Sequence, residues 1–179
     1  MTQVTDERLG KFSRFQHDIY ERVRKGSLDA NEVEKILRPL IGQKINEHFI
    51  DCDAAPFLPE GWKVEEHQKM GKIKFDSAKI DLYLSKKQKN GIIEGSKLSE
   101  ELKGKKVLNA NVLDYLLKNP HLIPEEWKGK YIFFWGTIFY FVGCICVRYL
   151  YWSGGRWYWD GFAFAHDFNS DCPAALLAS

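Results

Sequence analysis

Several features that would point directly to a partner are scarce in this sequence of 179 residues. The 26 basic and 24 acidic side chains leave a formal net charge of only +2, so overall charge indicates no class of partner. We find no internal repeat and no low-complexity tract, which excludes a solenoid array and a collagen-like fibre. The composition, 45% hydrophobic and 28% charged, is that of a globular domain with at most a small appendage.

Cysteine is scarce as well, and the first residues lack the features of a signal peptide. The four cysteines (Cys52, Cys144, Cys146 and Cys172) are too few and too unevenly placed for a disulfide framework. The opening MTQVTDERLG carries charges where a signal peptide needs an uninterrupted apolar core. We therefore expect reduced thiols and a cytoplasmic protein.

One long uncharged stretch, residues 131–147, lies between Lys130 and Arg148. A membrane helix needs about 20 apolar residues, and this stretch is shorter. It is rich in aromatic and β-branched side chains, and Gly136 and Gly143 interrupt it in the way that turns interrupt strands. We predict two buried strands joined by a tight turn, with a spanning helix as the less favoured alternative.

What the sequence has in excess is aromatic side chains, which make up 15% of the chain. They are densest in residues 131–141 and 149–164, and we predict an antiparallel meander of strands at about 131–141, 144–152 and 156–160. Both faces of the first strand are apolar, which is typical of a strand that is covered on both sides.

The rest of the chain is predicted to be helical up to the linker and a mixture of short strands and helices after it, which makes the fold class α+β. Residues 1–45 are expected to form a helical hairpin, with Asp29 as the cap of its second helix, and residues 46–60 a linker. Residues 61–179 are expected to form a compact domain whose C-terminal meander is covered by helices.

Within this domain, short strands are predicted at about 62–66 and 72–75, and helices at about 76–84 and 97–103. Asn109 is expected to cap a further helix that carries Val112, Leu113, Leu116 and Leu117.

Six segments together resemble an uncharacterised family of short bacterial hypothetical proteins that is common in genomes of candidate phyla. They are GWKVEEH (61–67), VLNANVLDYLL (107–117), LIPEEWKGKYIFFWGTI (122–138), VRYLYW (147–152), GGRWYW (154–159) and PAALLAS (173–179). The resemblance covers about residues 55–179 and implies no activity, cofactor or catalytic residue. The chain departs from the family at FYFVGCI (139–145), where a polar hairpin turn is expected.

Arg148 needs a partner, because an unpaired charge is costly in a hydrophobic strand. Alternation places it on the same face of the strand as Cys144, Cys146, Leu150 and Trp152. It either pairs internally with Asp160 or Asp167, or forms with Arg156 the anion-binding floor of a pocket. In the second case, the candidate ligand-binding residues for a sugar, base or peptide are Arg148, Trp152, Arg156, Trp157, Trp159 and Asp160.

Two weaker clusters suggest other chemistry. Cys144 and Cys146 lie two residues apart and could contribute to a metal site completed by His166, Cys172 or Cys52, although core thiols are the favoured interpretation. His166, Asp167 and Cys172 could supply a base and a nucleophile for a small hydrolase. No nucleophile elbow or phosphate-binding loop surrounds them, and turn formation explains them equally well. We therefore expect no cofactor or metal, and leave open whether the protein is an enzyme.

Three functions remain in view. The first is a non-catalytic module that binds a protein partner or itself. The second is a nucleic-acid-binding protein that uses exposed tryptophans and a rim of lysines. The rim consists of Lys86, Lys87, Lys89, Lys103, Lys105, Lys106, Lys128 and Lys130. The third is the hydrolase centred on His166, Asp167 and Cys172.

Overall fold

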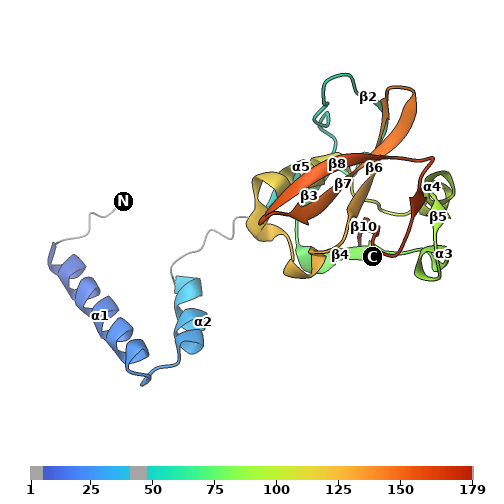
Figure 1. The fold of residues 1–179 in the computed structure, drawn as a ribbon. Coiled ribbons are helices and arrows are strands. Elements are labelled where there is room, and N and C mark those ends of the chain that lie inside the picture. The colour runs from blue at the N-terminus through green and yellow to red at the C-terminus, as the bar shows by residue number, and fades with distance from the viewer. Residues whose placement is uncertain (1–5, 41–47, 179) are drawn as a thin grey trace. The chain divides into compact units, whose positions relative to one another are not determined.

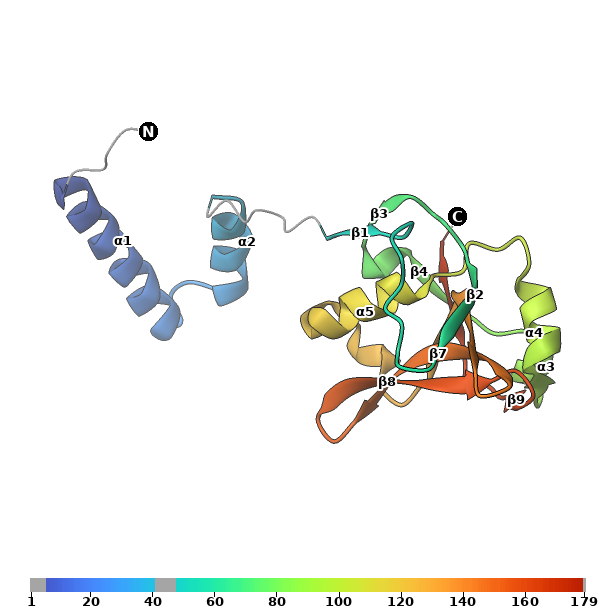
Figure 2. The ribbon, with the colours of Figure 1, turned by 90° about the horizontal axis from the view of Figure 1, so that it is seen from above.

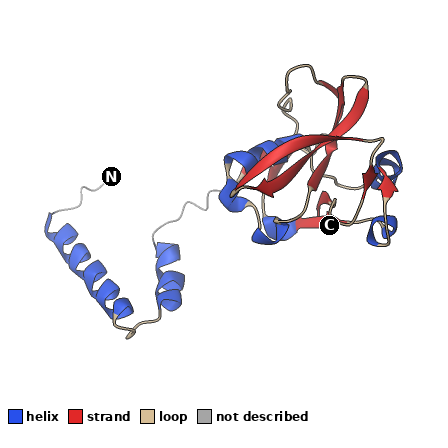
Figure 3. Cartoon of the chain, viewed as in Figure 1, coloured by secondary structure: helices blue, strands red, loops and turns tan. Residues whose placement is uncertain are grey.

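A computed structural model describes residues 6–40 and 48–178, with the backbone alone at residues 6–9, 12 and 37–40. The chain divides into two compact units, Met1–Glu47 and His48–Ser179. Helices and a large mixed sheet both contribute, and the expected α+β class is confirmed (Figure 3). The second unit begins at His48, so most of the segment that we expected to be a linker lies inside it.

The first unit consists of two helices, α1 (Asp6–Arg24) and α2 (Ala30–Leu40). Asp29 accepts hydrogen bonds from the backbone N–H groups of Asn31 and Glu32, as expected of a helix cap. Large apolar side chains on both helices remain exposed, with Phe15 at 59% and Ile36 at 64%. The described part of this unit therefore buries little apolar surface of its own.

The second unit is built on a six-stranded sheet. Its strands follow the order β4 (Ile80–Tyr83), β10 (Ala174–Leu177), β6 (Ile132–Phe141), β7 (Cys144–Ser153) and β8 (Arg156–Ala163), and β2 (Lys63–His67) also pairs with β6. Only the pairing of β10 with β6 is parallel. One edge of β6 is thus shared, with β10 paired at Phe133 and β2 paired from Thr137 onward (Figure 1).

Two small sheets and several short helices complete the unit. The sheets are β1 (Phe49–Asp51) with β3 (Lys72–Lys74), and β5 (Ile93–Glu94) with β9 (Asp167–Phe168). The helices are α3 (Lys86–Lys89), α4 (Gly95–Leu102) and α5 (Ala110–Lys118), and the 3-10 turns are Ser77–Lys79, Pro120–Leu122 and Glu125–Trp127. Figures 1 and 2 show α5 at one end of the sheet and α3 and α4 at the other.

The two faces of β6 face different cores. Ile132 and Phe134 pack with Leu113 and Leu116 of α5, whereas Phe133 and Trp135 pack with Leu98 and Leu102 of α4. Strand β6 thus has apolar contacts on both faces, and it pairs antiparallel with β7, which pairs antiparallel with β8. None of the helices in the described ranges has both the length and the apolar character that crossing a membrane requires.

One predicted element was wrong, and so was the expected place of the meander at the end of the fold. Instead of a helix over residues 76–84, Asp76 caps the 3-10 turn at Ser77–Lys79 and strand β4 follows. The ladder between β4 and β10 outweighs the local helical preference of this segment. The meander also does not end the fold, because β10 inserts between β4 and β6.

Gly136 allows a connecting segment to approach β6 closely. Its N–H donates to the carbonyl of Leu108, and its own carbonyl accepts from the N–H of Gln68. A Cβ atom here would lie 2.8 Å from the carbonyl oxygen of Val107. The absence of a side chain therefore allows residues 107–109 to lie against β6, with Asn109, the predicted cap, at the start of α5.

Candidate functional site

Arg148 is fully buried and pairs with Asp114 of α5. Its Nη2 donates to Asp114 Oδ1 at 2.7 Å, and its Nη1 donates to Oδ2 at 3.2 Å. The guanidinium carbon also lies 4.0 Å from the centre of the Trp159 ring. The carboxylate that neutralises Arg148 is thus neither Asp160 nor Asp167, and it comes from the helix that packs over the same face of the sheet.

The six predicted ligand-binding residues lie on two faces of the sheet. Arg148, Trp157 and Trp159 face α5, where both tryptophans are half-buried against the core. Trp152 lies edge-to-face with Trp157 at 5.3 Å and is covered by the Lys128 ammonium at 4.0 Å. Arg156 and Asp160 are exposed on the opposite face, because they alternate with the tryptophans along β8. The six therefore do not line a single pocket.

The face opposite α5 carries a row of tyrosines that the sequence analysis missed. The row runs across the strands from Tyr131 through Tyr151 to Tyr158, with ring centres 6.2 Å and then 5.7 Å apart. Tyr149 packs beside it, 5.6 Å from Tyr131 and 5.5 Å from Tyr151. A hollow of about 320 Å³ lies beside Tyr131, Tyr149 and Tyr151, with Lys130 at its rim. The alternation that placed Arg148 could have revealed this row.

The residues proposed for hydrolysis do not form a reactive pair. Cys172 is buried, and burial raises the pKa of its thiol, which disfavours the thiolate needed for attack. Its Sγ contacts Asn169 at 3.3 Å, while the ring of His166 packs on Phe162 at 5.0 Å. Asp167 is exposed in β9. Among the described residues, no hydrogen bond joins any two of the three.

The two cysteines considered for a metal differ in their surroundings. Cys144 is exposed, whereas Cys146 is buried and burial raises its pKa to about 11. Within residues 6–40 and 48–178, no group of three or more His, Cys, Asp or Glu side chains is arranged to hold a metal ion. Buried core thiols account for Cys52, Cys146 and Cys172.

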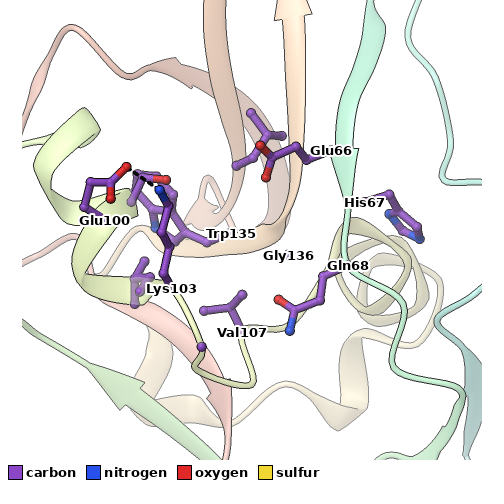
Figure 4. A pocket seen from close by; sticks show the side chains of 12 residues that line it. Glu66, His67, Gln68, Glu100, Lys103, Val107, Trp135 and Gly136 are labelled. Atoms are coloured by element: carbon purple, nitrogen blue, oxygen red, sulfur yellow. Dashed lines mark hydrogen bonds and ion pairs between the residues drawn. The ribbon is translucent and has the colours of Figure 1, made fainter.

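A hollow of about 580 Å³ lies between β2, α4 and β6 (Figure 4). Glu66 and Gln68 line one side of it, and a Lys103–Glu100 ion pair of 2.6 Å lines another. The buried indole N–H of Trp135 in its wall has no hydrogen-bond partner among the described residues. His67 turns away from it, with Nε2 at 3.0 Å from the carbonyl oxygen of Cys52 and Nδ1 at 2.8 Å from Thr137 Oγ1.

The end of the β6–β7 hairpin exposes apolar side chains. Val142 and Gly143 form its turn with φ values of +45° and +81°. Val142 is 76% exposed, and Phe141, Ile145 and the neighbouring Val64 are each 38% exposed. We call these four apolar residues the hairpin patch, and Figure 1 shows the hairpin end standing beyond the body of the sheet, beside β2.

Trp62 supports the hairpin patch from one side. Its ring stacks on Phe141, with the centres 5.1 Å apart and the planes at 22°. A hollow of about 320 Å³ lies next to this pair, lined also by Cys144, Asp160 and Phe162. The patch is therefore held in place by packing beneath it while its apolar surface faces outward.

Compared with known proteins, the chain matches no protein-family model, no curated protein and no solved structure. These comparisons thus leave the resemblance to short bacterial proteins untested.

Proposed function

We propose that the protein is a non-catalytic protein-interaction module and that the hairpin patch is its contact surface. The observation on which this depends is Val142. A turn with positive φ at both central residues favours Asn, Asp or Gly, and a β-branched residue is an outlier there. The left-handed conformation costs a non-glycine residue roughly 1–2 kcal/mol.

The stability of the fold does not explain a valine at position 142, where Asn, Asp or Gly would be less strained. Its side chain is more exposed than that of any other large hydrophobic residue in the described chain. Because strained residues concentrate where they serve function, the valine is best explained by a contact that compensates for its strain and exposure. The partner surface would be an apolar groove or an apolar helix face, since the hairpin patch exposes one aromatic and three aliphatic side chains. The exposed thiol of Cys144, next to the hairpin patch, fits the reducing cytoplasm that the sequence predicts.

A site-specific photo-cross-linker tests this proposal. We would place it at position 142 and, as the control, at exposed Lys87 on α3, and irradiate cells of the source organism. We expect one discrete protein adduct from position 142 and none from position 87. The adduct partner is then purified, and Val142→Asn is expected to weaken its affinity at least tenfold, or about 1.4 kcal/mol. The same adducts from both positions, or unchanged affinity for Val142→Asn, would count against the proposal.

A second candidate, nucleic-acid binding, is favoured by the tyrosine row. Aromatic rings spaced along a sheet can stack successive bases, and Lys130 and Arg156 lie near the two ends of the row. Trp157 and Trp159 pack against the core on the α5 side, so Tyr131, Tyr151 and Tyr158 on the opposite face would form the stacking platform instead. Tyr131 is exposed, and Tyr151 and Tyr158 are half-buried.

Fluorescence anisotropy with a labelled single-stranded oligonucleotide distinguishes this candidate from the first. If it holds, affinity falls steeply with added salt, and Tyr151→Ala weakens binding by roughly 1–3 kcal/mol whereas Val142→Asn leaves it unchanged. Absence of binding at low salt would remove the candidate.

A further inference from the structure

Strand β8 presents an unpaired backbone edge. It pairs with β7 on one side and ends the sheet on the other. Ser153 and Arg156 flank the two-residue turn, and further along the N–H of Phe164 donates to the carbonyl of Ile145. Antiparallel hydrogen bonding alternates from residue to residue. The backbone groups of Tyr158 and Asp160 therefore point toward β7, and those of Trp157 and Trp159 point away from the sheet.

Three common protections of a free edge, a bulge, a proline and a lysine, are missing from this strand. The β7–β8 pairing runs from Cys146↔Ala163 to Ser153↔Arg156 without a bulge, and β8 contains no proline or lysine. The N–H of Gly161 is covered by its neighbour, since Asp160 Oδ1 accepts from it at 2.7 Å. Among the described residues, nothing accepts from the N–H groups of Trp157 and Trp159. Two adjacent outward positions are thus open to another strand.

The sequence of this edge is symmetrical. Arg156-Trp157-Tyr158-Trp159-Asp160 reads the same in both directions apart from its ends, which carry opposite charges. Suppose that a second copy of β8 pairs antiparallel with the first about a two-fold axis at Tyr158. Arg156 then lies opposite Asp160 of the second copy, and Asp160 lies opposite Arg156 of the second copy. Trp157 then lies opposite Trp159 of the second copy. These are the residues whose backbone groups point outward, so they exchange both hydrogen bonds.

Backbone and side chains select the same register. Moving the axis by one residue in either direction removes the pairing of opposite charges. Moving it by two places Arg156 opposite Arg156, or Asp160 opposite Asp160, and like charges at opposed positions destabilise a sheet. Both residues are exposed, and no ion pair joins either of them to another side chain in the described ranges. Arg156 instead contacts Tyr158 of its own strand, with its guanidinium 4.6 Å from the ring centre.

From this complementarity we propose that the protein forms a two-fold symmetric homodimer through β8. The two sheets join into one continuous antiparallel sheet, held by backbone hydrogen bonds at Trp157 and Trp159 and by two Arg156–Asp160 ion pairs across the axis. The interface is separate from the hairpin patch, so the proposal does not depend on the proposed function.

Charge reversal gives a test that also controls for folding. Arg156→Glu places two acidic side chains opposite each other, and Asp160→Lys places two basic ones opposite each other. Sedimentation equilibrium of the full chain is expected to show a dimer for the unchanged protein. For each single variant we expect a dissociation constant at least tenfold higher. A one-to-one mixture of the two variants restores both opposite-charge pairs and is expected to form a heterodimer, as the double variant Arg156→Glu/Asp160→Lys is expected to form a homodimer.

Amide hydrogen exchange checks the backbone part of the interface. The N–H groups of Trp157 and Trp159 should be protected in the dimer and exchange faster in Arg156→Glu. The N–H of Tyr158, which bonds to β7, should be protected in both. Lys87→Glu, a reversal on exposed α3, is the control and should change neither measurement.

Three results would overturn the homodimer. One is a monomer at all concentrations of the unchanged protein. Another is a dimer that survives each single reversal. The third is stronger association of Asp160→Lys alone, which would show that Asp160 guards the edge against pairing.

Discussion

Removing the carboxylate of Asp114 should destabilise the second unit strongly. Arg148 is buried completely, and in Asp114→Ala its charge would lose both hydrogen bonds, of 2.7 and 3.2 Å. Breaking one side of a buried pair typically costs about 3–5 kcal/mol. The Asp114 side chain is 18% exposed, so water can reach this end of the pair, and the Trp159 ring still covers the guanidinium at 4.0 Å. We therefore expect the lower end of the range, about 3 kcal/mol.

Urea unfolding followed by tryptophan fluorescence measures this cost. All 6 tryptophans lie in the second unit, so the signal reports that unit alone. Asp81→Ala, at an exposed carboxylate on β4, is the matched control and should change stability by less than about 0.5 kcal/mol. Replacing both partners, in Arg148→Met/Asp114→Leu, should recover most of the loss, because no unpaired charge remains buried. A cost below about 1 kcal/mol for Asp114→Ala would refute the reasoning, since it would mean that Arg148 is neutralised or hydrated in another way.

Three further predictions concern stability. Val142→Asn should raise the free energy of unfolding by roughly 1 kcal/mol in thermal melts, because asparagine tolerates a positive φ, and a lower melting temperature would contradict this. Gly136→Ala should lower the free energy of unfolding by more than about 2 kcal/mol in urea, since the alanine Cβ would lie 2.8 Å from the Val107 carbonyl oxygen. An unchanged stability would show that residues 107–109 can move away from β6. The free energy of unfolding should fall as pH rises from 9 to 12. Burial in the folded state raises the pKa of Cys52 and Cys146 to about 11 and that of Tyr149 to about 12. The folded state therefore retains protons that the unfolded chain releases in this range. Tyr149→Phe should flatten the upper part of this decline.

The meander was predictable because its signals are local. Apolar residues on both faces of 131–141 indicate a covered strand, and the pair Gly154-Gly155 supplies positive φ values at a two-residue turn. Asn109 was predictable for the same reason, since its side chain caps the helix that follows it directly.

Long-range pairing was not predictable in this way. Sequence reasoning showed that Arg148 needs a counter-charge, but Asp114 lies 34 residues away and becomes its partner only because α5 packs on that face of the sheet. Strand β10 carries four apolar residues with no alternation, and only its position between β4 and β6 makes it a strand. The symmetrical run at 156–160 can be seen in the sequence. It suggests pairing with a second copy only because β8 lies at the edge of the sheet, and the sequence does not show which strand is at the edge.

The position of β10 affects how the second unit can form during synthesis. Its residues lie inside the sheet, hydrogen-bonded to β4 on one side and to β6 on the other, although they are translated after every other strand. Until residues 174–177 leave the ribosome, β4 cannot join the meander, and the apolar faces of both remain exposed to other nascent chains and to chaperones. The last step in forming this sheet therefore waits for the synthesis of β10, and deletion of residues 174–177 would remove the strand that joins its two halves.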